Sequence, residues 1–276
     1  MGGQAIDGRP EWGRWPRVDG TPRRELRSLL AGGYTGFSSA TEPRRLRLVA
    51  TASVPLVVKI RDSAWRPPGF VHGVHGSYSV VDGDCAPEYL EVRLAPLGAY
   101  VLLGRPMDEL SGQFVDLTEL FGPSGRRLGE RVRAESTWRR RFDIMDEFLL
   151  RRLDTGPRPT PEMVWAWRRL VGSGGTVAIR QLAAEVGWSH KHLITKFKRE
   201  IGLAPKTAAR LVRFQQALGR LDQQPSPRWE QVAADGGYAD QAHLVRDFRE
   251  FTGSTPAALW DTTRAGKPAS APHLTR

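Results

Sequence analysis

Cysteine is almost absent from this chain, because Cys85 is the only one in 276 residues. A single thiol forms neither an internal disulfide nor a zinc site built from several thiolates. We therefore interpret Cys85 as a small packing residue rather than a redox or nucleophilic centre. Long hydrophobic runs are also missing, since no stretch approaches the roughly 18 apolar residues of a membrane span. The first residues lack the basic and apolar regions of a signal peptide, so we expect a cytoplasmic protein without membrane association.

Acidic residues are outnumbered by basic ones. The chain has 41 Lys and Arg against 30 Asp and Glu, which gives a net charge of +11 and an isoelectric point near 10.4. Residues 157–260 carry 15 basic and 9 acidic side chains, a net of +6, so more than half of the net positive charge lies there. This excess favours a polyanionic partner, although charge alone does not distinguish nucleic acid from a membrane surface.

Short apolar runs separated by Gly, Pro and Asp fill residues 34–116. The clearest runs are 47–50, 54–60, 77–81 and 89–94. The last alternates apolar and polar residues, and the first two are rich in branched side chains, which indicates a mostly antiparallel β domain. A small barrel or sandwich is the expected architecture. Residues 96–104 look like a turn leading into a buried segment.

His72 and His75 are close enough in sequence to suggest a metal site. Such a site needs at least a third ligand, and nothing nearby supplies one. On a strand, a spacing of three would also place the two rings on opposite faces. We therefore expect structural histidines, no metal and no cofactor.

Residues 128–153 show a helical period. Trp138, Phe142, Met145 and Leu149 form an apolar stripe, and the other face carries Arg139, Arg140, Arg141, Asp143, Asp146 and Glu147. Packing of this stripe on its own domain is favoured over pairing with a second subunit, so a homodimer stays open. The composition then divides the chain as follows: a flexible arm (1–25), a β-rich domain (26–153), a linker (154–159), a helical domain (160–260) and a flexible tail (261–276).

Residues 178–260 contain the same helical unit twice. Each copy has a short alanine-rich helix, a glycine turn with an aromatic residue, a second helix and a Gly-x-x-Pro end. The offset is 50 residues before the turn (Leu182 to Val232) and 51 after it (Leu193 to Leu244), so the second turn is one residue longer. This is the pattern of two helix-turn-helix motifs.

The second helix of each copy presents cationic and hydrogen-bonding side chains outward, as a helix that reads the major groove requires. A merely solvated surface is the plainer interpretation, but the duplicated tight turn counts against it. In the first copy the candidate DNA contacts are Ser189, His190, Lys191, His192, Thr195, Lys198 and Arg199. In the second copy they are Gln241, Ala242, His243, Arg246 and Arg249, following Asp240 as the helix cap. Arg246 is the strongest candidate, because a guanidinium can bond both guanine acceptors.

A helix predicted over residues 206–221 joins the two copies. Its 16 residues span on the order of 24 Å at about 1.5 Å each, which would place the two reading helices about one DNA turn, roughly 34 Å, apart. Lys206 and Arg210 on this helix are expected to contact phosphates. A monomer would then contact two successive major grooves at an asymmetric site.

Residues 160–260 resemble the DNA-binding domain of the AraC/XylS transcriptional regulators. The resemblance is most specific in the second copy, at Gly237-Tyr238-Ala239-Asp240, Gln241-Ala242-His243-Leu244 and Gly253-Ser254-Thr255-Pro256. It implies an all-α domain of two helix-turn-helix motifs joined by a long helix, which binds specific double-stranded DNA and controls transcription, usually by activation with RNA polymerase. The first half resembles the cupin-like effector or oligomerisation domains of this family, so the expected fold class is α+β. The sequence does not identify a small-molecule effector.

Two other functions stay open. A sequence-neutral architectural DNA binder fits the charge equally well. A DNA alkyl-transfer repair enzyme would need an activated cysteine and a four-cysteine zinc site, whereas Cys85 has no cationic neighbour in sequence nearer than Arg93. We therefore expect a protein that is not an enzyme.

Overall fold

The computed structural model describes residues 17–38, 45–61, 67–82, 88–221 and 227–264. Cys85 lies outside these residues, as do residues 1–16 of the expected arm and 265–276 of the expected tail. Within the described part of the chain, no helix is long and apolar enough to span a membrane.

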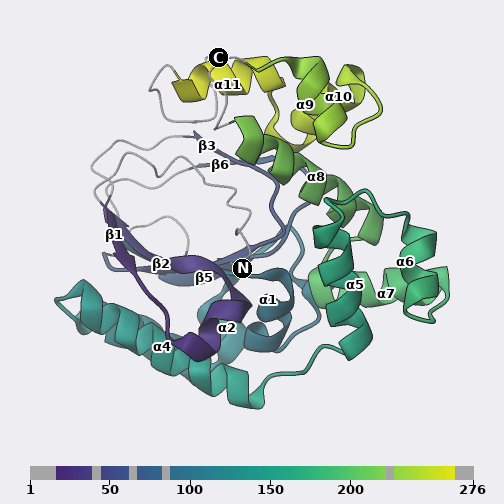
Figure 1. The fold of residues 1–276 in the computed structure, drawn as a ribbon. Helices are drawn as coiled ribbons and strands as arrows, with labels where there is room; N and C mark the ends of the chain where they lie inside the picture. The colour runs from purple at the N-terminus through teal and green to yellow at the C-terminus, as the bar shows by residue number, and fades with distance from the viewer. Residues whose placement is uncertain (1–16, 39–44, 62–66, 83–87, 222–226, 265–276) are drawn as a thin grey trace.

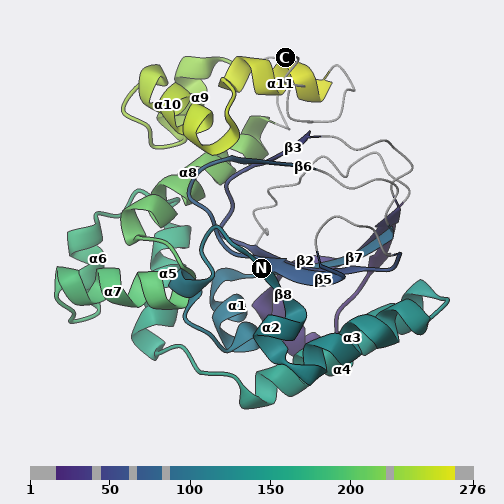
Figure 2. The same cartoon turned by 180° about the vertical axis from the view of Figure 1, so that it is seen from behind.

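The N-terminal half is built on two antiparallel sheets (Figure 1). Six strands form the larger sheet in the order β1 (Arg17–Gly20), β2 (Leu30–Ser38), β7 (Glu88–Leu94), β4 (Val54–Lys59), β5 (Gly69–His72) and β8 (Phe114–Asp116). The smaller sheet pairs β3 (Arg45–Leu48) with β6 (Ser79–Asp82) and lies between the larger sheet and the C-terminal helices (Figures 1 and 2). The predicted α+β class and antiparallel sheet are confirmed.

The alternation in β7 gives the larger sheet two different faces. Leu90 and Val92 belong to the main core, whereas Tyr89 belongs to a second buried cluster with Phe37 and Phe70. Successive residues of a strand point to opposite faces, so one sheet carries both clusters. Helices cover the face that carries the main core (Figure 2).

The helices of this half pack against one face of the larger sheet. In chain order they are the short 3-10 helix η2 (Arg24–Leu29), α1 (Pro96–Leu103), the 3-10 helix η3 (Met107–Glu109), α2 (Leu117–Phe121), α3 (Pro123–Ala134) and α4 (Trp138–Thr155). The single helix predicted over 128–153 is wrong, because Thr137 ends the pattern with extended backbone and accepts a hydrogen bond from the Arg140 amide. Thr137 therefore caps a new helix, α4. Residues 96–103 form the buried helix α1 rather than a simple turn.

The apolar stripe of α4 packs on its own sheet. A Cβ atom added to Gly36 would lie 2.3 Å from the Trp138 ring, and one on Gly20 would lie 2.5 Å from the Phe142 ring. These strand glycines therefore allow α4 to approach closely. The stripe that might have paired with a second subunit is thus used within the chain.

Two charged residues assigned to the solvated face of α4 are in fact buried. Asp146 accepts a hydrogen bond from the Tyr34 hydroxyl at 2.6 Å and another from the Arg23 amide at 3.1 Å. Arg141 pairs with Glu88 at 2.8 Å and lies over the Trp138 ring. The sequence period did not reveal these long-range partners.

Residues of the expected arm and linker belong to regular elements that contact the sheet domain. Arg17–Gly20 of the arm forms strand β1, which pairs along its whole length with β2 through backbone bonds although its side chains are largely exposed. Strand β1 therefore forms through backbone pairing, without an alternating apolar pattern in its sequence. Helix α4 continues to Thr155, and Arg152 near its end donates to the carbonyls of Leu102 and Leu103 in α1.

His72 and His75 contradict the expectation that their rings lie on opposite faces. Strand β5 ends at His72, the chain then turns, and the two ring centroids lie 4.6 Å apart. His72 stacks on Phe114 at 4.0 Å, and His75 contacts the Val49 carbonyl at 3.1 Å. Among the described residues there is no group of three metal-ligating side chains.

The C-terminal half is entirely helical in its described residues. It consists of α5 (Pro161–Gly172), α6 (Ile179–Glu185), α7 (His190–Ile201), α8 (Pro205–Leu221), α9 (Trp229–Asp235), α10 (Gln241–Thr252) and α11 (Pro256–Arg264). Thr160 caps α5 by accepting a hydrogen bond from the Met163 amide. Helix α11 extends past residue 260 into the expected tail.

Candidate nucleic-acid interface

The first helix-turn-helix unit consists of α6, a tight turn and α7. Gly187 in the turn has a φ of 70°, a conformation that glycine adopts without steric cost. Ser189 accepts a hydrogen bond from the His192 amide at 3.1 Å and so caps α7. Leu193 and Phe197 are fully buried, which turns the opposite face of α7 to solvent.

The second unit repeats this arrangement with α9 and α10. Gly237 also has a φ of 70°, and Asp240 accepts from the His243 amide at 2.6 Å. The cap follows the glycine by three residues here and by two in the first unit, so the predicted longer turn is confirmed. Leu244 and Phe248 are fully buried.

An aromatic–histidine contact recurs in both units and was not anticipated. The Trp188 ring meets His192 edge to face at 4.8 Å, and Tyr238 meets His243 in the same way at 5.2 Å. Each pair ties the corner of the turn to the first turn of the following helix. The offset of 50 residues before the cap and 51 after it relates the two pairs and could have revealed them from the sequence.

Most of the candidate DNA contacts are exposed on their helices. In the first unit all seven candidates are exposed: Ser189, His190, Lys191, His192, Thr195, Lys198 and Arg199. In the second unit Gln241, Ala242, Arg246 and Arg249 are exposed, and His243 is half-buried against Tyr238. Helices α7 and α10 therefore display cationic and hydrogen-bonding groups to solvent, and the contacts of these groups with DNA stay predictions.

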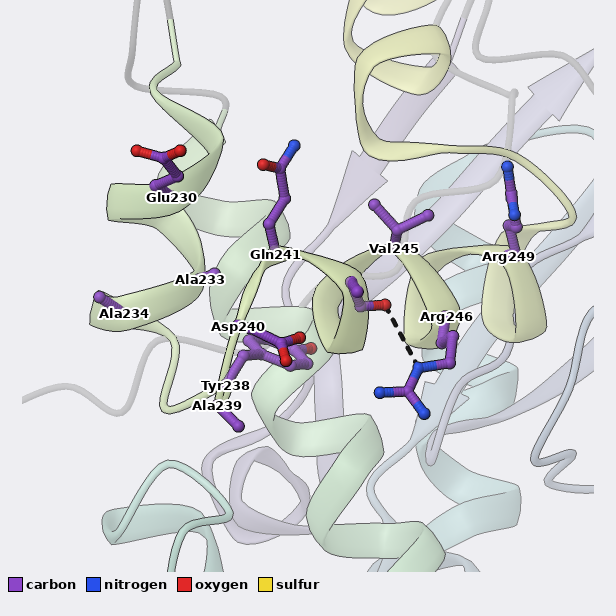
Figure 3. Close-up of a pocket in the computed structure, with 11 residues that line it drawn as sticks. Glu230, Ala233, Ala234, Tyr238, Ala239, Asp240, Gln241, Val245, Arg246 and Arg249 are labelled. Carbon is purple, nitrogen blue, oxygen red and sulfur yellow. Dashed lines mark hydrogen bonds between the residues drawn. The ribbon is translucent and has the colours of Figure 1, made fainter.

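The exposed surface of the second unit is hollowed. An open depression of about 910 Å³ lies between α9 and α10, and Figure 3 shows the residues that line it. Gln241, Val245 and Arg249 extend to one side of α10, and Arg246 extends to another. The Arg246 Nε atom reaches back to the Ala242 carbonyl at 3.4 Å, and this guanidinium makes no other hydrogen bond to a described residue. The half-buried Val245, which sequence reasoning missed, adds an apolar group to this hydrogen-bonding surface.

Helix α8 is continuous, as predicted, and begins one residue earlier, at Pro205. Lys206 in its first turn is exposed. Arg210 was predicted to contact a phosphate, but in this structure two carboxylates of α10 hold its guanidinium. Two of its nitrogens donate to Asp247 Oδ1 at 3.1 and 2.7 Å, and two donate to Glu250 at 3.0 and 2.5 Å. Arg210 therefore joins the connecting helix to the second reading helix.

The charges around this ion pair act on neighbouring groups. The hydrogen bonds from Arg210 to Glu250 and Asp247 raise the pKa of the Arg210 guanidinium. Burial, together with the Asp247 charge, raises the pKa of the Tyr238 hydroxyl. Asp247 itself is 1% exposed, so its carboxylate depends on protein partners rather than water.

The loop that follows α5 packs against both α8 and the turn of the second unit. A Cβ atom on Gly175 would lie 2.1 Å from the Ala209 carbonyl oxygen in α8, and one on Gly237 would lie 2.6 Å from the Thr176 side chain. Arg213 donates to the Gly237 carbonyl at 3.3 Å and lies over the Tyr238 ring. The second turn is therefore packed against the loop between α5 and α6 as well as against α8.

Two family models match separate parts of this chain. Residues 182–261 match the family model of a helix-turn-helix domain, and residues 20–116 match a domain of unknown function (DUF6597). A search of curated proteins found none that matches.

The solved structures that match include those of ToxT from Vibrio cholerae. One, at 1.65 Å resolution, is 10% identical, with a TM-score of 0.47 over 83% of this chain and 97% of that one. Another, of unsaturated fatty acid bound wild-type ToxT, is 11% identical, with a TM-score of 0.43 over 82% and 94%.

The family match covers both units from Leu182 in α6 to Asp261 in α11. It coincides with the duplicated turns, the capped second helices and the continuous α8. Residues 182–261 of this chain are therefore a DNA-binding helix-turn-helix domain of the type that the resemblance to the AraC/XylS transcriptional regulators predicted.

Proposed function

We propose that this protein is a sequence-specific regulator of transcription whose helices α7 and α10 read adjacent major grooves of one DNA duplex. The observation that carries the proposal is the pair of capped helices with exposed cationic faces, held on one continuous helix. The two faces differ, because the first offers Lys191 and Thr195 whereas the second offers Gln241 and Arg246. We therefore propose that each monomer recognises an asymmetric site.

Selection from random duplexes tests this proposal. The full chain should enrich one bipartite motif whose half-sites lie about one helical turn apart. A sequence-neutral binder would enrich no motif, and bulk genomic DNA would compete with every duplex equally. Failure to enrich a motif would therefore refute sequence-specific reading and favour the architectural alternative.

Arg246→Ala tests the role of the second reading helix. Loss of a bidentate guanidinium contact should relax the preference at one base position and cost about 1–3 kcal/mol there. Lys206→Ala should instead weaken all sequences alike and reduce the slope of log affinity against log salt by about 0.9. Arg126→Ala, which removes an exposed charge from α3, is the matched control and should leave both quantities unchanged.

We further propose that the bound protein activates transcription from cytoplasmic DNA together with RNA polymerase, and that its N-terminal half responds to a small-molecule effector or mediates dimerisation. A reporter placed behind the selected site tests the sign of regulation. Expression should rise with the wild-type chain and return to baseline with Arg246→Ala. A fall in expression would instead identify a repressor.

A further inference from the structure

One short segment of the N-terminal half touches the C-terminal half at three places. We call residues 73–78, which connect β5 to β6, the bridging segment. Its first contact is with the end of α7, where a Cβ on Gly202 would lie 2.4 Å from the Val74 side chain. Its second is with the start of α8, where a Cβ on Gly76 would lie 2.9 Å from the Thr207 side chain.

The third contact is with the end of the second reading helix. The last carbonyls of an α-helix have no partner within the helix and need donors from elsewhere. In α10 the Glu250 carbonyl accepts from the Tyr78 amide at 3.0 Å, and the Phe251 carbonyl accepts from the Ala50 amide at 2.9 Å. Both donors belong to the N-terminal half. The end of α10 is thus completed by backbone groups of another part of the chain.

The bridging segment is itself anchored to the sheet domain. His75 lies within it and contacts the carbonyls of Val49 and Gly73 at 3.1 and 3.4 Å through its two ring nitrogens. A β-bridge pairs His75 with Thr51, one residue after the Ala50 amide that bonds to α10. The two loops that reach α10 are therefore fastened to each other.

These contacts bear on how far apart the two reading helices lie. The bridging segment passes the end of α7, the start of α8 and the end of α10, so it runs beside the helix that connects the two units. We propose that the bridging segment is a positioning element of the DNA-binding surface. Together with α8 it sets the separation of α7 and α10, and hence the half-site spacing that the protein accepts. This inference rests on the proposed function, because it presupposes a bipartite site.

Tyr78→Pro tests the proposal directly. Proline removes the amide that bonds to Glu250. Tyr78→Ala is the matched control, since it shortens the same partly exposed side chain and keeps the amide. Each protein is titrated with the selected duplex and with duplexes that have one base pair inserted or deleted between the half-sites.

The wild type and Tyr78→Ala should lose about tenfold in affinity when the spacing changes, a penalty on the scale of one mismatched base pair. Tyr78→Pro should lose less than about threefold, because a freed α10 adapts to the altered spacing. A general loss of structure would lower affinity for all duplexes without changing their ratio. An unchanged ratio in Tyr78→Pro would overturn the proposal.

Hydrogen exchange without DNA separates this inference from the proposed function. Amides 250–253 at the end of α10 should exchange faster in Tyr78→Pro than in Tyr78→Ala, because the last turn opens more often. If the wild type enriches no bipartite site, the proposed function is wrong. Equal hydrogen-exchange rates in Tyr78→Pro and Tyr78→Ala would separately refute the positioning role of the bridging segment. If circular dichroism shows that Tyr78→Pro is unfolded, Gly76→Val replaces it. Its side chain would push the segment away from Thr207 and is expected to relax the spacing in the same way.

Discussion

Replacing Arg210 with methionine should destabilise the C-terminal half, because this side chain compensates a buried carboxylate. Asp247 is 1% exposed, and the Arg210 guanidinium gives it two hydrogen bonds. Removing one partner of a buried ion pair costs about 3–5 kcal/mol, because the other charge is left without compensation. The Arg210 side chain is 23% exposed, so water can reach part of the site. We therefore expect a loss of about 3 kcal/mol in the free energy of unfolding.

Urea denaturation of the full chain measures this loss. Lys206→Ala, one turn earlier on α8, is the matched control and should change the free energy of unfolding by no more than about 0.5 kcal/mol. Adding Asp247→Leu to Arg210→Met should recover most of the loss, because replacing both partners removes the uncompensated charge. If Arg210→Met kept full stability but reduced the salt dependence of DNA binding as Lys206→Ala does, Arg210 would be a phosphate contact and this reasoning would be wrong.

Two further predictions concern the turns and the bridging segment. Gly187→Ala should lower the free energy of unfolding by about 1 kcal/mol, because alanine is strained in the left-handed backbone of that turn. Gly237→Ala should lower it by about 2 kcal/mol, because its Cβ would also meet the Thr176 side chain. Equal losses in denaturation experiments would argue against the contact with Thr176. Burial holds the pKa of His75 below its usual value of 6.5, so its contribution to stability is complete above that pH and is lost as the pH falls towards the folded-state pKa. The free energy of unfolding should therefore fall more steeply from about pH 7 to about pH 5 in the wild type than in His75→Gln, and parallel pH profiles would show that His75 does not contribute.

Local signals in the sequence were reliable where a single element satisfies its own requirements. The cap Asp240 and the glycine turn in each copy, at Gly187 and Gly237, were predicted and are confirmed. Each depends on a side chain or backbone conformation within a few residues. Strands with clear alternation were found for the same reason, whereas β1 and the break before α4 carried weaker patterns and were missed.

The candidate site was only partly predictable, because side chains of one helix were judged without their neighbours. Helical spacing placed Arg246 and Lys191 on exposed faces, and the structure agrees. The same reasoning assigned Arg210 to DNA, although it is engaged by carboxylates 37 and 40 residues further along the chain. A periodic pattern shows which face of a helix is polar, but it does not show what that face meets.

By itself, the sequence of this protein determined the two helix-turn-helix units, their caps and the longer second turn, because these depend on helical period and on glycine and capping residues close together in the chain. Only the tertiary structure decided that α4 packs on its own sheet, that Arg210 joins α8 to α10, and that residues 73–78 touch both reading helices. The physical reason is the same in each case. These contacts join groups far apart in the chain, and the bonds at the end of α10 use backbone amides that every residue except proline possesses.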